Sequence, residues 1–397
     1  MAVDAADRGG AARSGTSLLY NPAVRQFVYQ ALTVVFVIWL FWYAGTNAAA
    51  NLARANMTAG FDFLGSRAGF DIAQTPIEYS SDSTYMRALM LGLVNTLIVA
   101  FTGIITASII GLLVGIGRLS NNWLISRIST VYVEVFRNIP PLLVIFFWYK
   151  GVLSLLPDVK QSLSLPLSVF VSNRGIYMPA PIFGEGMIFV LAAFVVGVIG
   201  AVFYSRWATQ RQLATGIRPP VLLINLALII GLPVLAFLAI GAPVTFDIPE
   251  LGKFNMRGGT VVGPEFLSLY MALSFYTAAF IAEIVRAGIK GVSKGQSEAA
   301  GALGFRSGLT TRLVILPQAL RIIIPPLTSQ YLNLTKNSSL AVAIGYADLV
   351  AVGGTILNQS GHSIEIIAIW MLIYVSISLA TSLFMNWFNA KMALVER

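Results

Sequence analysis

Long apolar runs alternate with short polar loops along most of the chain. Eight runs are long enough to cross about 30 Å of hydrocarbon as helices. The predicted spans are approximately 27–44, 89–117, 131–156, 187–204, 221–240, 266–284, 320–344 and 364–388. A soluble domain could not cover so many apolar segments. The pattern therefore predicts an all-α integral membrane protein with about eight transmembrane helices.

The first apolar run has two interpretations. Ala48 and Ala50 follow it and resemble the small-residue site at which a signal peptide is cleaved. However, the run begins only after the polar stretch 1–26, and it ends in the aromatic cluster at 39–43, which suits a membrane interface. We therefore expect a retained helix.

Basic residues are divided unevenly between the two sides of the predicted membrane. Sixteen Lys and Arg lie on the side of the two termini and eight on the other, whereas acidic residues number four and about ten. Six of the sixteen lie between Arg286 and Arg321, around Glu298. By the positive-inside rule, both termini and the loop at 285–319 are predicted to be cytoplasmic.

The composition agrees with a membrane protein and removes several classes of function. The chain is 57% hydrophobic and 11% charged, and the charged share is about half that of soluble domains. Its net charge of +9 comes from basic residues scattered between apolar blocks, which form no footprint for nucleic acid. With no cysteine and a single histidine, His362, we predict no metal site and no catalytic residue.

The predicted cytoplasmic loop 291–317 has the pattern of two short helices joined by a sharp turn. Ser293 and Gln296 have the spacing of a capping box, and Gly304 can adopt the left-handed conformation that ends a helix. A second helix is expected to begin near Ser307 and to stop at Pro317. The pattern fits either a docking element or an ordinary solvated loop.

A longer motif in this loop favours the docking element. Glu298-Ala299-Ala300, then Gly304, then Val314 to Pro317 resemble the E-A-A-x(3)-G-x(9)-I-x-L-P motif of permease subunits of bacterial ABC importers, with Val314 in place of isoleucine. The resemblance implies a coupling helix seated in a groove of a cytoplasmic ATPase. The implied coupling residues are Ser297, Glu298, Ala299, Ala300, Gly304 and Arg306. Small alanines would let the partner approach closely, and the glycine would permit the turn.

Four further stretches, 95–97, 136–143, 282–289 and 334–340, resemble the polar amino acid importers within this family. Asn138 and Ile139 depart from the usual F-R-G-T-P form of the second stretch. With the extra N-terminal span and a long insertion, the chain resembles the larger Q-type permease of general L-amino-acid importers. It is similar also to permeases for glutamate, glutamine, aspartate and asparagine. The implied fold is a type I importer (MetI-like) core of five helices.

The resemblance also divides the chain into segments. They are a cytoplasmic tail at 1–26, an N-terminal transmembrane helix and periplasmic loop at 27–88, the first part of the core at 89–156, an insertion with two spans at 157–264, and the second part of the core at 265–397.

The implied assembly is a complex in the bacterial inner membrane. This multi-pass chain would pair with a second permease subunit, with a heterodimer expected, and with two copies of an ABC ATPase and a periplasmic amino-acid-binding protein. No stretch fits G-x(4)-G-K-[ST], so the chain is expected to bind no cofactor, with ATP and Mg held by the ATPase. It would then be a transport subunit, not an enzyme, moving L-amino acids by alternating access.

Two other functions are weighed against this one. A stand-alone secondary amino acid transporter would show inverted repeats and broken helices near the membrane midplane, and no internal repeat is evident. An intramembrane enzyme would need a nucleophile and base or metal ligands within the spans, which this sequence lacks.

Polar residues recur on one face of the seventh predicted span. The predicted substrate path consists of Gln330, Asn333, Lys336, Asn337 and Ser338. Lys336 would attract the α-carboxylate, while Asn337 and Ser338 would sort the side chain. Many members of the family have an acid after this lysine, so Asn337 favours neutral or acidic amino acids. The alternative is that these groups hold helices together, with Lys336 paired to an acid such as Glu283.

Three smaller patterns are assigned to packing. Glu134 and Arg137, like Glu283 and Arg286, stand three apart and are predicted to form ion pairs as gate or packing residues. The Gly111-x-x-x-Gly115 pattern predicts close contact between helices. His362, near a span end, is expected to be structural or solvated.

Overall fold

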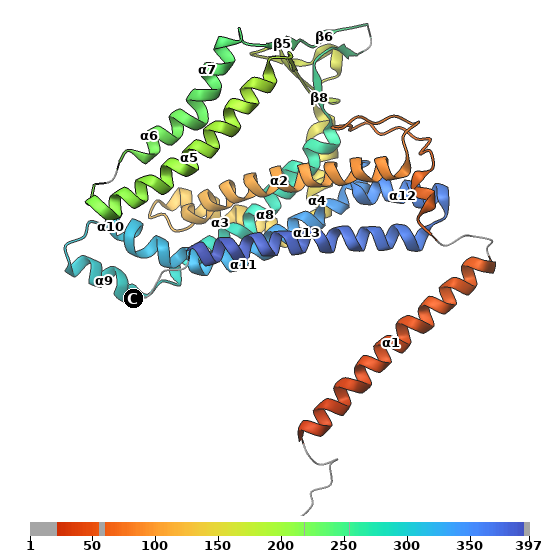
Figure 1. Cartoon of the computed structure of the whole chain (residues 1–397), viewed down its shortest axis with the longest axis horizontal. Helices are drawn as coiled ribbons and strands as arrows, with labels where there is room; N and C mark the ends of the chain where they lie inside the picture. The colour runs from red at the N-terminus through yellow and green to blue at the C-terminus, as the bar shows by residue number, and fades with distance from the viewer. Residues whose placement is uncertain (1–21, 55–59, 218, 254, 393–397) are drawn as a thin grey trace, which may run out of the picture.

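The computed structural model of the chain describes residues 22–54, 60–217, 219–253 and 255–392. Helices form most of it, and a small group of strands lies at one end (Figure 1). Most of the predicted tail 1–26 and the last five residues fall outside the described ranges.

The helices are as follows. They are α1 Pro22–Arg54, η2 Asp62–Gly65, α2 Tyr85–Gly117, α3 Trp123–Asn138, α4 Pro141–Phe146, η3 Phe147–Val152, η4 Leu153–Leu155, η5 Val159–Gln161, α5 Met187–Thr215, α6 Val221–Leu226, η6 Ala227–Gly231, α7 Leu232–Ala239, α8 Pro264–Lys290, α9 Lys294–Ala302, α10 Ser307–Thr310, η7 Thr311–Ile315, α11 Leu316–Asn337, η8 Ser338–Ile344, α12 Leu349–Ser360 and α13 Ser363–Met392.

By length and composition, seven helical runs in the described chain could cross a membrane, and a bent pair gives an eighth. The seven are Val24–Asn47, Tyr85–Gly117, Met187–Thr215, Val221–Ala239, Pro264–Lys290, Ser307–Ile344 and Ser363–Lys391. The prediction of about eight transmembrane helices in a mainly helical fold is confirmed. The first run is a helix that stands apart from the others and buries none of its surface (Figure 1).

The third predicted span, at 131–156, is not one straight helix. Its chain forms α3 and the segment Pro141–Leu155, which meet at an angle of 111°. Two prolines explain the break, because a residue before proline is disfavoured in the helical region and proline has no N–H to donate. Ile139 and Pro140 are accordingly extended, with ψ of 133° and 139°.

Pro317 does not stop a helix, contrary to the prediction. The chain from Ser307 to Ile344 is one helical run that contains Pro317 and the pair Pro325 and Pro326. The π-turn η7 ends two residues before Pro317, and the π-turn η6 likewise ends two residues before Pro233. A π-turn widens the backbone and rearranges the hydrogen bonds where a proline cannot donate, so the helix continues.

Two features of the fold were not predicted from the sequence. The helix α12 follows a buried turn and is too short to span a membrane. The predicted insertion carries small antiparallel sheets with strands β1 Leu163–Leu165, β2 Val169–Ser172, β3 Gly175–Met178, β4 Ala180–Phe183, β5 Val244–Asp247, β6 Glu250–Leu251, β7 Met256–Arg257 and β8 Thr260–Val262. Their orders are β1-β2-β3-β8, β4-β5 and β6-β7, so strands on both sides of the α5–α7 hairpin pair with each other.

The core is built around the packing of α2 against α8. A Cβ atom at Gly111 would lie 2.6 Å from the Cβ of Ile281, and one at Gly115 would lie 2.8 Å from the carbonyl oxygen of Ala282. Only glycine lets the two helices approach this closely, which confirms the predicted role of the glycine pattern. Gly288 repeats the device between α8 and α11, since its Cβ would lie 2.3 Å from Cγ1 of Ile323.

Replacing Gly111 by alanine is expected to destabilise the protein. The added methyl group must displace Ile281, and overpacking of this kind costs about 1–3 kcal/mol. The control is Gly354→Ala, because Gly354 lies in α12 with no atom within 4 Å of its added Cβ. Thermal unfolding in detergent should show a lower Tm for Gly111→Ala and an unchanged or higher Tm for Gly354→Ala. Equal Tm values for the two variants would contradict the close contact.

Candidate functional site

The turn after α9 has the geometry that the sequence predicted. Gly304 has a φ of +77°, its N–H donates to the Gly301 carbonyl at 2.9 Å, and the Phe305 N–H donates to the Ala300 carbonyl at 3.0 Å. These two bonds form a Schellman motif. At the other end of α9, Ser293 is the N-cap residue, as predicted. Its side chain makes no capping hydrogen bond, so the predicted capping box is not formed.

Most of the predicted coupling residues face outward. Ser297, Glu298, Ala299, Gly304 and Arg306 are exposed on α9 and the turn after it. Ala300 differs, because it is 3% exposed and faces the chain's own helical run. Its small side chain therefore lets α9 pack closely against this chain. The helix α9 lies at the end of the molecule opposite the strands (Figure 1).

A charged cluster lies near the same end, between α2, α3 and α8. Glu283 accepts hydrogen bonds from Arg118 at the end of α2 and from Arg286 one turn along α8, with Nε of Arg286 at 3.1 Å. The Arg118 side chain is 11% exposed and also lies 3.8 Å from the carboxylate of Glu134. The predicted Glu283–Arg286 pair is therefore present as part of a larger network.

The predicted pair of Glu134 and Arg137 is not formed. The Glu134 carboxylate is directed to Arg118, and the guanidinium of Arg137 lies 5.7 Å from the centroid of the Phe280 ring on α8. Although these two residues are one helical turn apart, each finds its partner on a different helix. All four residues, Glu134, Arg137, Glu283 and Arg286, make contacts between helices near the end of the molecule that carries α9.

The predicted path residues, on α11 and at the start of η8, differ in exposure. Asn333 and Lys336 are exposed, Gln330 and Asn337 are half-buried, and Ser338 is fully buried. The Ser338 hydroxyl donates to the Thr335 carbonyl at 2.7 Å. Ser338 was predicted to sort the substrate, but its hydroxyl bonds the chain's own backbone. The exposed face of α11 also carries Ile322, Pro325, Pro326 and Ser329.

The alternative pairing of Lys336 with Glu283 is absent. Both oxygens of the Glu283 carboxylate are engaged by Arg118 and Arg286. Among the residues that the structure describes, no carboxylate lies within 4 Å of the Lys336 ammonium group. Lys336 is thus an exposed cation inside a membrane-spanning run.

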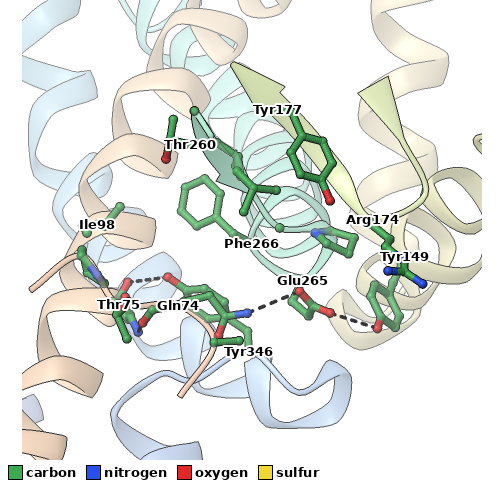
Figure 2. A pocket seen from close by; sticks show the side chains of 18 of the residues that line it. Gln74, Thr75, Ile98, Tyr149, Arg174, Tyr177, Thr260, Glu265, Phe266 and Tyr346 are labelled. Carbon is green, nitrogen blue, oxygen red and sulfur yellow. Dashed lines mark hydrogen bonds between the residues drawn. The ribbon is translucent and has the colours of Figure 1, made fainter. Parts of the chain in front are cut away.

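A cavity of about 900 Å³ lies at the other end of the molecule, between the strands and the start of α8. Figure 2 shows Glu265 near its centre, with Tyr149 and Gln74 on either side. The Glu265 carboxylate accepts hydrogen bonds from Tyr149 Oη and Gln74 Nε2, both at 3.4 Å. Arg174 and Tyr177, from the β2–β3 hairpin, also line the cavity.

Sequence comparisons identify the family of the chain. Residues 219–394 match the family described as binding-protein-dependent transport system inner membrane component. The general L-amino acid transport system permease protein AapQ of Rhizobium johnstonii is 62% identical over 396 residues, which cover 100% of this chain and 99% of the relative. The chain belongs to the inner-membrane permeases of binding-protein-dependent ABC transport systems.

Two further similarities were found. The glutamate/glutamine/aspartate/asparagine transport system permease protein BztB of Rhodobacter capsulatus is 43% identical over 406 residues, or 93% of this chain and 95% of the relative. Among solved structures, an amino acid ABC transporter crystallised with histidines has 20% identity and a TM-score of 0.46, covering 77% of this chain and 95% of that one.

The permease is therefore a multi-pass inner membrane protein and a transport subunit of an ABC importer, not an enzyme. In such importers a partner ATPase hydrolyses the ATP. A stand-alone secondary transporter is not favoured, because the relatives are permease proteins of multi-subunit transport systems.

The permease has a buried polar group near the cavity that the sequence did not single out. Asn95 is 1% exposed, and its amide donates to the carbonyls of Gln74 at 3.0 Å and Ala347 at 2.9 Å. Tyr346 donates to the Asn95 carbonyl at 3.2 Å.

Burial raises the pKa of Asp348, which caps α12, to about 6. The resemblance at 95–97 was the signal that could have located this cluster.

His362 is structural, as expected. Its ring stacks on Phe63 with centroids 4.2 Å apart, and Nδ1 lies 3.0 Å from the Ser360 carbonyl oxygen. In the described part of the chain, no three His, Cys, Asp or Glu side chains are grouped as metal ligands.

Replacing Glu283 by glutamine is expected to lower the free energy of unfolding by about 3 kcal/mol. It would leave Arg286 without its carboxylate, and the largely buried Arg118 with only the carboxylate of Glu134 at 3.8 Å. Asp82→Asn is the control, because the Asp82 and Arg67 side chains are 76% and 67% exposed and such pairs contribute at most about 1 kcal/mol. Denaturant unfolding in detergent measures both variants. Similar losses would show that the network does not stabilise the permease.

Proposed function

We propose that this permease imports L-amino acids by alternating access, as one half of the transmembrane part of an ABC importer. Its relatives AapQ and BztB are named as permeases for general L-amino acids and for glutamate, glutamine, aspartate and asparagine. The observation that carries the proposal is Lys336, an exposed lysine in the helical run Ser307–Ile344 with no carboxylate within 4 Å among the described residues.

The position of Lys336 along the helical run supports the proposal that it lies deep in the membrane. It is eight residues from Ile344, and at about 2 Å per residue of the 3-10 turns this places it about 15 Å from the end of the run. The hydrocarbon layer is about 30 Å thick, so Lys336 lies close to its middle. A lysine facing lipid there costs about 3 kcal/mol, which favours a position facing water or a second permease subunit.

The chemistry of this face suits an amino acid. The Lys336 ammonium group can bind the α-carboxylate, and the amides of Asn333 and Asn337 can donate to or accept from a polar side chain. Asn337 carries no charge to attract a basic side chain. The cargo we propose is therefore a neutral or acidic L-amino acid.

The turn around Gly304 is the proposed docking element for the ATPase. Leu303 and Phe305 are 75% and 41% exposed beside it, next to the exposed Glu298. Apolar side chains exposed in a cytoplasmic loop favour contact with a protein. The complete importer would contain this chain, a different second permease, two ATPases that hold ATP and Mg, and a periplasmic amino-acid-binding protein. Both termini would be cytoplasmic.

Replacing Lys336 by alanine should raise the KM for L-glutamine uptake at least about tenfold, because a charge-assisted hydrogen bond is lost. Uptake is measured in vesicles that contain the complete importer. Lys253→Ala is the control, since Lys253 is an exposed lysine in the segment between β6 and β7. Unchanged uptake of neutral and acidic amino acids by Lys336→Ala would refute the proposed path.

Replacing Glu298 by lysine should weaken ATPase binding about tenfold while leaving membrane insertion unchanged, because the substitution reverses one exposed charge of α9. Co-purification of the ATPase and substrate-stimulated ATP hydrolysis are the measurements. Glu250→Lys makes the same charge change in β6, far from α9 (Figure 1). Normal coupling in Glu298→Lys would count against α9 as the docking helix.

A further inference from the structure

The cavity beside α8 contains two opposite charges that do not pair with each other. Glu265 and Arg174 both line it. Neither group has an ion-pair partner within 4 Å among the described residues. Glu265 instead receives two hydrogen bonds of 3.4 Å from neutral groups. An anionic and a cationic site are therefore both open toward the same space.

The walls of the cavity are held in place by the fold. Asn95 binds the backbone of Gln74, so the loop that carries this donor is tied to α2. A Cβ atom at Gly263 would lie 3.1 Å from Oε2 of Glu265, so glycine leaves room for that carboxylate. A Cβ at Gly175 would lie 2.2 Å from the Val262 carbonyl oxygen, so glycine also lets the β2–β3 hairpin close onto β8 with Arg174 at its turn.

Aromatic rings complete the lining. Tyr149, Tyr177, Phe266 and Tyr346 surround the two charged groups (Figure 2). Burial raises the pKa of Tyr177, and the nearby positive charge of Arg174 opposes this. A volume of about 900 Å³ lies within the range of sites for small organic molecules, roughly 300–1,000 Å³. The cavity thus combines one anion, one cation and several apolar surfaces.

We propose that this cavity is a second binding site for a free L-amino acid, separate from the path along α11. Arg174 would bind the α-carboxylate, Glu265 would bind the α-ammonium group, and the aromatic rings would contact the side chain. The site is built from the strands of the insertion and the outer ends of α2 and α8. It would hold the amino acid at the mouth of the permease before it enters the membrane. This inference rests on the proposed amino acid cargo.

The absence of cysteine provides a direct test on the complete importer in nanodiscs. Thr260 is an exposed residue of β8 that lines the cavity, so Thr260→Cys supplies a single labelling site on this chain. L-glutamine should slow its reaction with a maleimide severalfold. Thr245→Cys, on exposed β5 outside the cavity, should react at an unchanged rate. An equal rate at Thr260→Cys with and without L-glutamine would overturn the proposal.

Charge variants test the two recognition groups. Arg174→Gln and Glu265→Gln, each added to Thr260→Cys, should raise the L-glutamine concentration needed for half-protection about tenfold or more, as expected for the loss of a charge-assisted hydrogen bond. Arg257→Gln, on β7 and outside the cavity, is the matched control. Protection that is the same in all three variants would refute these roles. Protection by the binding protein alone, and not by L-glutamine, would make the cavity a docking surface and also overturn the proposal.

The proposed cargo and the proposed second binding site can be tested independently. Uptake of L-glutamine by the wild-type importer tests the cargo, and protection of Thr260→Cys tests the cavity. Uptake without protection would refute only the outer site. In Lys336→Ala, protection should persist while uptake is impaired, because Lys336 does not line the cavity.

Discussion

The close approach of α2 and α8 is the contact on which the rest of the permease depends. Without a Cβ at Gly111 and Gly115, the two backbones come close enough for side chains of α8 to pack against bare backbone. Polar groups at both ends of α8 are placed by this contact. Glu265 and Glu283 are 18 residues apart, about 27 Å along the helix, so one helix positions both the cavity and the charged network around Glu283.

The helical run Ser307–Ile344 connects the remaining functional elements. It begins directly after the glycine turn that ends α9, and it carries Lys336 at the proposed path. Because a π-turn precedes Pro317, α9 is followed by one continuous helical run in spite of that proline. Gly288 places this run against α8, so its motion is constrained by the same core.

The insertion gives the permease a group of strands at the end opposite α9. Strands from both sides of the α5–α7 hairpin pair with each other, and β3 and β8 then cover the start of α8. Much of the α5–α7 hairpin surface remains apolar and exposed, as expected for a segment in contact with lipid. The insertion therefore adds a wall to the cavity beside α8 as well as two further spans.

The sequence alone determined the number of spans, the glycine contact and the turn at Gly304, because hydrophobic length and glycine spacing act locally. It did not determine the strands, because each pairs with a segment far away in the sequence. Nor did it determine the fate of the prolines, since proline can either break a helix, as at Pro140, or be accommodated by a π-turn, as at Pro317. The partners of Glu134 and Arg137 were decided in the same way. One helical turn allows these two charges to meet, but Arg118 and Phe280 on neighbouring helices offer better placed partners, and only tertiary packing brings them there.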